Sequence, residues 1–282
     1  MINEIGISVS IVSYMILMLA IGIWSSKQNA STDDFYLGGR RLGPVVTAMS
    51  AEASDMSSWL LMGLPGIAYI SGLADASWTA IGLALGTYLN WLLVAKRLRR
   101  YTIKANNSIT IPSFFANRFR DKSRILLAVS AIWILIFFIP YTASGFAACG
   151  KLFHTLFGVN YILAMLVSAA VIILYTMLGG FLAASTTDLV QSIVMTVALV
   201  IVVLFGINAA GGLDRVLENA RGIAGYLSLR QMGNSNVPQT ATPYTFMQAF
   251  ANLAWGLGYF GMPHILLRFM AIGDEKKIKV SR

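Results

Sequence analysis

The stretch SAEASDMSSWLLMGLPG, residues 50–66, places acidic and hydroxyl side chains inside an otherwise apolar part of the chain. Asp55 is the residue that most needs an explanation in this stretch. A carboxylate at the centre of a membrane helix costs about 2.5–3.5 kcal/mol on insertion scales, and it usually faces a cavity, a partner or an ion. A structural alternative is that Asp55 caps a half-helix beginning at Met56 or Ser57. Three nearby hydroxyl groups either bind a cation or hydrogen-bond an unwound backbone: those of Ser54, Ser57 and Ser58.

Helix-breaking residues follow this polar stretch and recur in one later apolar segment. Gly63, Pro65 and Gly66 come first, and WGLGYFGMP (255–263) comes second. Breaks inside a membrane are tolerated where they line a cavity. An unwound turn frees carbonyl oxygens for a cation, and a half-helix N-terminus attracts an anion. Two broken spans separated by four intact ones fit an inverted-repeat transporter, although Gly and Pro are also common in ordinary membrane helices.

The composition is that of an integral membrane protein. The chain is 57% hydrophobic and 12% charged, whereas soluble domains carry about 25% charged residues. The net charge of +9 does not indicate a nucleic-acid-binding protein, because the charges lie between apolar runs. We predict seven membrane spans, at residues 5–24, 44–71, 76–95, 125–150, 160–181, 188–208 and 246–267.

The basic residues predict the orientation of these spans. The first span is preceded by Glu4 and followed by Lys27, so it is not a signal peptide and its amino terminus lies outside. With alternating loops, 17 of the 21 basic residues then fall inside, as the positive-inside rule requires. The four that fall outside are Lys151, Arg215, Arg221 and Arg230. This count places Arg268 among the inside charges after the last span.

The loops carry weaker signals. ITIPSFFANRF (109–119) predicts a short interfacial helix starting near Pro112, with its phenylalanines on one side. The outside stretch 209–245 predicts an exposed loop with some local helix. The chain stops at Arg282 in a charged segment, so we expect a fragment of a longer protein.

Several other residues have competing interpretations. Asp188 begins the predicted sixth span, where an acid interacts favourably with the helix dipole, but an ion-pathway role competes. Arg40 has two possible roles. It either fixes the membrane topology and contacts lipid headgroups, or it takes part in gating. Cys149, His154 and His264 have no metal-ligand spacing. No Walker, Rossmann, nucleophile-elbow or zinc motif is present, so the sequence predicts no enzyme and no cofactor.

Three segments together resemble the sodium/solute symporter family, most closely its sodium/proline symporters, over nearly the whole chain: residues 33–66, 173–191 and 255–271. The resemblance implies an all-α polytopic, leucine-transporter-type inverted-repeat fold with one extra amino-terminal helix. Residues 5–24 would be that extra helix, 44–208 the first five-helix repeat and 246–267 the first helix of a truncated second repeat.

The resemblance also implies roles for particular residues. Ala53 and Met56 would give backbone carbonyls to sodium, supported by Asp55 and Ser57. Arg40 and Asp188 match positions tied to sodium coupling or gating. The proline pocket would be lined by Trp59, Gly63, Tyr141, Trp255, Tyr259 and Pro263. Further sodium ligands in that family come from a later helix, so we expect residues 1–282 alone to bind sodium weakly or not at all.

The expected function is therefore sodium-coupled import of L-proline across the plasma (cell inner) membrane by a multi-pass protein, with sodium as coupling ion. Proline needs a positive helix end for its carboxylate, acceptors for its ammonium and apolar walls for its ring. The alternatives are a sodium symporter for another small organic solute, such as pantothenate, and a transporter-like sensor domain.

Overall fold

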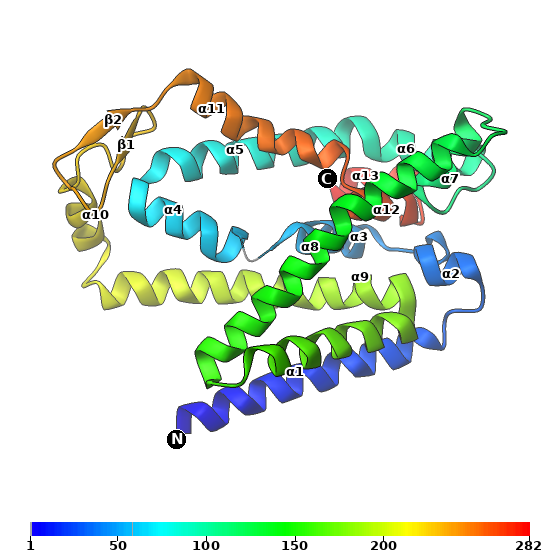
Figure 1. The fold of residues 1–282 in the computed structure, drawn as a ribbon, viewed down its shortest axis with the longest axis horizontal. Coiled ribbons are helices and arrows are strands. Elements are labelled where there is room, and N and C mark those ends of the chain that lie inside the picture. The colour runs from blue at the N-terminus through cyan, green and yellow to red at the C-terminus, as the bar shows by residue number, and fades with distance from the viewer. Residues whose placement is uncertain (1, 58) are drawn as a thin grey trace. The chain divides into compact units, whose positions relative to one another are not determined.

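A computed structural model describes residues 2–57 and 59–282, and most of this chain is helical (Figure 1). Ser58, one of the hydroxyls considered above, lies outside the described residues. The helices are α1 (Ile2–Ser26), α2 (Thr32–Leu37), α3 (Pro44–Asp55), α4 (Leu64–Ser71), α5 (Leu73–Asn90), α6 (Lys96–Lys104), α7 (Ile111–Arg118), α8 (Ile125–Phe157), α9 (Tyr161–Ala209), α10 (Leu213–Arg221), α11 (Phe246–Leu253), α12 (Pro263–Ala271) and α13 (Ile278–Ser281), and the strands are β1 (Gln231–Gly233) and β2 (Ala241–Pro243).

Four helical segments are long and apolar enough to cross a membrane by length and composition: Gly6–Ser26, Leu73–Lys104, Ile125–Phe157 and Tyr161–Ala209. Large apolar side chains along them are exposed, for example Phe137 at 64% and Phe205 at 72%. Side chains that face lipid need no protein cover, so this exposure fits membrane helices. α8 continues to Phe157, seven residues beyond the predicted end of its span at residue 150.

α9 contains two of the predicted spans, divided at Gly180. This residue has φ 60° and ψ −150°, and a Cβ added there would lie 2.6 Å from the carbonyl oxygen of Phe35. Only glycine adopts this conformation readily, and α9 turns back on itself in Figure 1. The helix resumes directly after Gly180. Asp188 therefore lies about two turns inside it, and the prediction of Asp188 as a first-turn acid is wrong.

The hydroxyl residues before Asp188 explain that error. A run of Ser and Thr often marks a helix start, because these side chains cap exposed N–H groups. Here Thr186 Oγ1 donates to the Leu182 carbonyl at 2.8 Å, and Thr187 Oγ1 donates to the Ala184 carbonyl at 2.8 Å. Such bonds to a preceding turn are made inside a helix.

The predicted interruptions of the second and seventh spans are confirmed. α3 ends at Asp55, Met56 and Ser57 are not helical, and a π-helical turn at Trp59–Gly63 leads into α4. In the seventh span a 3-10 segment, Ala254–Phe260, separates α11 from α12. α12 extends the span to Ala271, beyond the predicted end at residue 267.

The loops agree with the sequence only in part. The predicted helix near Pro112 is α7, whose Thr110 and Ser113 form a capping box. Residues 209–245 contain the local helix α10, but they also contain a hairpin that was not predicted. β1 pairs antiparallel with β2, with Met232 opposite Thr242. Strands of three residues with glycine or proline at an end carry too little alternation to be recognised.

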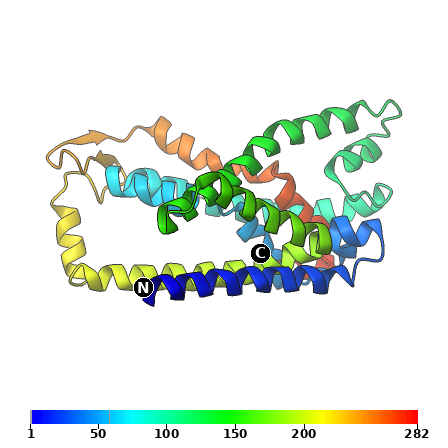
Figure 2. The ribbon, with the colours of Figure 1, turned by 60° about the horizontal axis from the view of Figure 1, so that its bottom comes forward.

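The chain divides into two compact units, and each is described separately. The first unit comprises Met1–Ser54, Ala95–Val190 and Pro263–Ser281. Its most buried segment is the end of α12, where Phe269, Met270 and Ala271 are fully buried. Leu42 pairs with Ile272 beside it. α1 runs along the first half of α9 (Figures 1 and 2), and Gly22 permits the approach, since an added Cβ would lie 2.9 Å from Tyr175 Cβ.

The second unit comprises Asp55–Val94 and Gln191–Met262, with Arg282. Its central contact joins α5 to α11 and the 3-10 segment, which lie side by side in Figure 1. Gly82 and Gly86 of α5 make this contact possible. A Cβ on Gly82 would lie 2.6 Å from the Leu253 carbonyl oxygen, and one on Gly86 would collide with the Gly256 backbone. Two of the boundaries between units fall at the two helix breaks, after Ser54 and after Met262.

Candidate functional site

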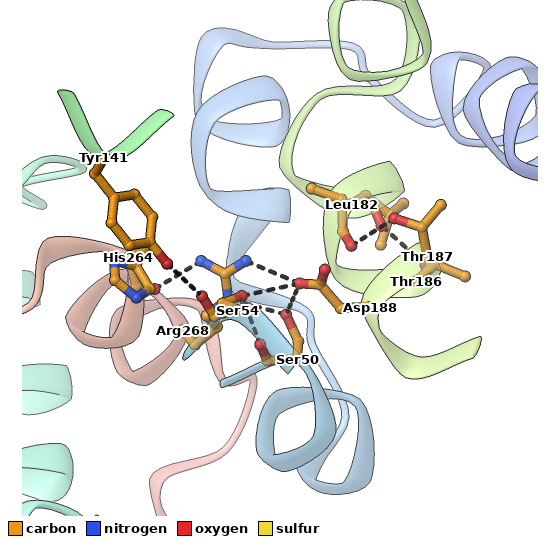
Figure 3. A network of polar contacts seen from close by, with 10 residues as sticks. Ser50, Ser54, Tyr141, Leu182, Thr186, Thr187, Asp188, His264 and Arg268 are labelled. Atoms are coloured by element: carbon orange, nitrogen blue, oxygen red, sulfur yellow. Dashed lines mark hydrogen bonds and ion pairs between the residues drawn. The ribbon is translucent and has the colours of Figure 1, made fainter. Parts of the chain in front are cut away.

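Asp188 is the centre of a polar network in the first unit (Figure 3). Its Oδ2 atom accepts from Arg268 Nη2 at 2.9 Å and from Ser50 Oγ at 2.7 Å. Ser54 Oγ lies 3.1 Å from the same oxygen and donates to the Ser50 carbonyl at 2.6 Å. The two charged side chains are only 16% and 9% exposed. Asp188 is therefore a largely buried carboxylate whose countercation is part of the protein.

Arg268 is the functional candidate that the sequence analysis missed, because it was counted with the inside loop charges. It is buried within α12, not in a loop. Its Nε donates to Ser50 Oγ at 2.9 Å, and its Nη1 donates to the His264 carbonyl at 2.7 Å. The signal that could have found it is the apolar run PHILLRFMA, which continues past the arginine for a further turn. An arginine inside such a run needs a buried anion.

Tyr141 of α8 lies against the same network. Its hydroxyl donates to the Ser54 carbonyl at 3.4 Å, and its ring stacks on His264 with ring centres 5.9 Å apart (Figure 3). Phe138 meets the His264 ring edge-on at 5.4 Å. His264 directly follows Pro263, the first residue of α12. The first unit therefore brings together Tyr141 and the start of α12, two of the places expected to line the substrate pocket.

Arg40 holds the other end of α12. Its guanidinium donates to the Met270 carbonyl at 2.8 Å and to the Ser108 carbonyl at 2.8 Å, with further bonds to Thr102 and Asn107. Burial and the nearby Arg99 charge lower the pKa of Arg40 to about 10, with Asp33 acting in the opposite direction, so it remains a cation at neutral pH. These partners favour a role in fixing α12 over contact with lipid headgroups.

Asp55 in the second unit has a different environment. It is half-buried at the end of α3, and its Oδ2 atom accepts a short hydrogen bond from the Tyr259 hydroxyl. Among the residues that the structure describes, Asp55 forms no ion pair. Described helical structure resumes at Trp59, which argues against Asp55 as the cap of a helix starting at Met56 or Ser57. Tyr259 belongs to the 3-10 segment, so this bond joins the two helix breaks.

The aromatic residues at the two breaks also meet within the second unit. The Trp59 and Trp255 rings are stacked, with centres 4.4 Å apart and planes 18° from parallel. Trp255 is 50% exposed. The Trp59 ring lies over Gly63, where a Cβ would come 2.8 Å from Cδ1 of the indole. The glycine therefore permits the position of Trp59.

The remaining predicted sodium ligands lie at the first break. Ala53 is in the last turn of α3, and Met56 and Ser57 are half-buried in the non-helical segment that follows. The carbonyl groups in the last turn of a helix lack the N–H partners that helix continuation would supply. The Ser57 carbonyl accepts from the Leu60 N–H at 3.1 Å. Oxygen atoms suited to a hard cation are therefore concentrated at this break.

A comparison with protein families identifies this architecture. The model of the sodium:solute symporter family matches residues 35–282. The chain belongs to this family. It is 45% identical over 279 residues to the osmoregulated proline transporter OpuE of Bacillus subtilis, covering 99% of this chain and 54% of that protein. It is 46% identical over 269 residues to the sodium/proline symporter of Escherichia coli, covering 95% and 51%.

A solved symporter structure shows the same fold. A sodium-coupled sialic acid symporter in a substrate-bound, outward-open state aligns with a TM-score of 0.77 over 96% of this chain and 54% of its own. The identity is 19%, so this likeness establishes the fold alone. The expected all-α, leucine-transporter-type fold is confirmed. The chain spans about half the length of the relatives it matches.

Proposed function

We propose that the protein imports L-proline together with sodium across the plasma membrane by alternating access. The observation that carries this proposal is Asp55, a carboxylate at a helix break with a hydroxyl partner and no ion pair among the described residues. A carboxylate in an apolar span calls for a cation. The proline transport named for relatives at 45–46% identity supports the choice of substrate.

Sodium is proposed to bind at the first break. The backbone carbonyls of Ala53 and Met56 are its proposed ligands, and Asp55 and Ser57 support them. Unwound carbonyls coordinate sodium in transporters of this architecture. One charge crossing 100 mV supplies roughly 2.3 kcal/mol, so an inward sodium gradient and membrane potential can drive accumulation. Sodium is the coupling ion, and no other cofactor is proposed.

Proline is proposed to bind between aromatic and small residues at the two breaks. The proposed lining is Trp59, Gly63, Tyr141, Trp255, Tyr259 and Pro263. Stacked indoles suit the apolar pyrrolidine ring, because aromatic faces pack well against aliphatic rings. The amino end of α12 at Pro263 offers a positive dipole to the carboxylate. Carbonyl groups freed by the 3-10 segment are acceptors for the secondary ammonium.

Arg40 and Asp188 are proposed to act in coupling or gating rather than in direct substrate contact. Both hold α12, Arg40 at its carboxyl end and Asp188 through Arg268. A change in either contact would change how the second broken helix is held. We further propose an amino terminus outside, residues 44–208 as the first repeat, and 246–267 as the start of the second.

Uptake of labelled proline by cells producing the complete gene product tests this function. The expected result is uptake that requires a sodium gradient, is absent when choline replaces sodium, and is competed by unlabelled proline. Stronger competition by pantothenate or another amino acid would replace proline with that substrate. Sodium-independent uptake would overturn the coupling proposal, and the absence of any transport would favour a sensor.

A further inference from the structure

Asn90, the last residue of α5, connects that helix to the second helix break. It is 1% exposed, and its side-chain nitrogen donates to the backbone carbonyl of Tyr259 at 2.8 Å. A carbonyl only accepts, so the amide group must present its NH₂ here and turn its oxygen away. The glycine contact between α5 and the 3-10 segment, at Gly86 and Gly256, brings the two backbones close enough for this short side chain to reach.

Two hydrogen bonds at opposite ends of the residue help to hold Tyr259. Its carbonyl accepts from Asn90, and its hydroxyl donates to Asp55. The tyrosine itself is 7% exposed. These two bonds form a chain of contacts from α5, through the second break, to the carboxylate at the first break. All three residues belong to the second unit.

The local sequence alone does not fix Tyr259. It lies in a 3-10 segment between Gly258 and Gly261, and glycine loses more backbone freedom on ordering than any other residue. The hydrogen bond from Asn90 of the neighbouring helix to the Tyr259 carbonyl adds a constraint that the local sequence does not supply. Asn90 Oδ1 is buried and has no hydrogen-bond partner within the described ranges 2–57 and 59–282. A buried amide group with its oxygen unsatisfied is unfavourable for stability. The hydrogen bond from the Asn90 side-chain nitrogen to the Tyr259 carbonyl is therefore the favourable contact that Asn90 makes here.

We propose that Asn90 is a positioning residue of the sodium-coupling site. By fixing the Tyr259 carbonyl, it directs the Tyr259 hydroxyl to Asp55 and sets the orientation of that carboxylate. This inference rests on the proposed sodium-coupled transport. It makes a specific claim about kinetics: loss of the Asn90 donor raises the sodium concentration for half-maximal uptake and leaves the rate at saturating sodium nearly unchanged.

The test measures sodium dependence of proline uptake by the complete gene product carrying Asn90→Leu, Tyr259→Phe or both. Leucine keeps the branched shape of asparagine without the donor, although its side chain is larger. Each single variant is expected to raise the half-maximal sodium concentration about 3–10-fold, the effect of one hydrogen bond. The double variant is expected to raise the half-maximal sodium concentration no further than the larger of the two single changes. Both substitutions interrupt the same series of hydrogen bonds from Asn90 through Tyr259 to Asp55. Thr79→Val, which alters another buried polar side chain of α5 (3% exposed), is the matched control and leaves the value unchanged.

Other results overturn the inference. An Asn90→Leu protein with an unaltered sodium dependence would do so, as would a double variant whose shift is the product of the single shifts. A lower amount of protein with normal sodium dependence would give Asn90 a merely structural role. If Asn90→Leu is not recovered in the membrane, Asn90→Ala is judged by the same criteria. Failure of the wild type to show sodium-dependent uptake would instead reject the proposed function.

Discussion

Asp188 and Asp55 are both carboxylates within apolar parts of the chain, but their surroundings differ. Asp188 in the first unit pairs with Arg268 at 2.9 Å and accepts from Ser50. Asp55 in the second unit accepts from the Tyr259 hydroxyl and, among the described residues, pairs with no cation. A buried carboxylate with a built-in cation is neutralised by the fold. A carboxylate with only a hydroxyl partner keeps a charge that a mobile cation can neutralise.

The two carboxylates meet different requirements of a membrane protein: one contributes to a stable fold, and the other is available to a transported cation. The Asp188 network joins α3, α9 and α12 through hydrogen bonds and an ion pair between groups of the protein itself. The Asp55 contact lies at a break, where backbone oxygens are also available. Replacements in the first network should therefore change stability and the gating that depends on α12, and replacements at the break should change the sodium concentration for half-maximal uptake.

The largest effect on stability is expected from Arg268→Leu. Removing one partner of a buried ion pair leaves the other charge uncompensated, which costs about 3–5 kcal/mol. The thermal transition of the purified complete gene product in detergent measures this loss. Arg41→Gln, which removes the pair of Arg41 (64% exposed) with Asp34, is the control with little effect. An Arg268→Leu transition equal to that of the control would show that Asp188 does not depend on its built-in cation.

Ser50→Ala is expected to have the next largest effect. The Ser50 hydroxyl accepts from Arg268 and donates to Asp188, and hydrogen bonds to charged groups contribute about 1.5–3 kcal/mol. The thermal transition should fall while the half-maximal sodium concentration stays constant. Ser57→Ala, at the break, should give the opposite pattern. If Ser50→Ala changed the half-maximal sodium concentration without lowering the thermal transition, the distinction between the two regions would be wrong.

Gly86→Ala tests the backbone contact on which the second unit depends. An added methyl group would collide with the Gly256 backbone, and overpacking of this kind costs about 1–3 kcal/mol. The expected result is a lower thermal transition together with a weaker sodium response, since the 3-10 segment must move. Gly66→Ala is the matched control in α4, because a Cβ there has no neighbour within 4 Å. Equal effects of the two changes would contradict the proposed close contact.

The smallest effect is expected from Glu275→Gln. Arg100 donates to Glu275 at 2.7 Å, and this hydrogen bond and the Arg100 charge hold the pKa of Glu275 below its ordinary value of 4.5. A lowered carboxyl pKa stabilises the folded state above about pH 4.5 and ceases to do so as the pH falls through the lowered pKa. The pair is partly exposed and screened by solvent, so its contribution to stability is small.

The same pair predicts a specific pH dependence. The wild type should be slightly more stable than Glu275→Gln at pH 7, and the difference should be lost at a pH below the lowered pKa of Glu275. Thermal transitions of both proteins at the two pH values measure it. A difference that grows on acidification would show that the sign of the Glu275 contribution is wrong.

The sequence predicted the helix breaks because their signals are local. Asp55, Gly63 and Pro65 are close in the chain, as are Gly256, Gly258 and Pro263, and each group disrupts a helix by its own chemistry. The membrane class and the short helix at Pro112 were predictable for the same reason. Span ends were less accurate, because apolar composition does not mark the last turn of a helix.

The partners of the polar residues could not be predicted from local pattern. Asp188 and Arg268 are 80 positions apart, and only folding brings them together. Arg268 resembled a loop charge because it follows the predicted end of a span. The Asp188 position was misjudged because the STT run imitates a helix start, whereas Gly180 makes the turn earlier. The link from Asn90 to Tyr259 likewise depends on a contact between distant segments.

The most direct test of the central claim is a sodium titration of proline uptake in proteoliposomes containing wild type or Asp55→Asn protein. If Asp55 provides the charge for sodium, Asn at this position should raise the half-maximal sodium concentration by about 30–100-fold, equivalent to roughly 2–3 kcal/mol, with little change in the thermal transition. An Asp55→Asn protein with the wild-type sodium dependence would contradict the account.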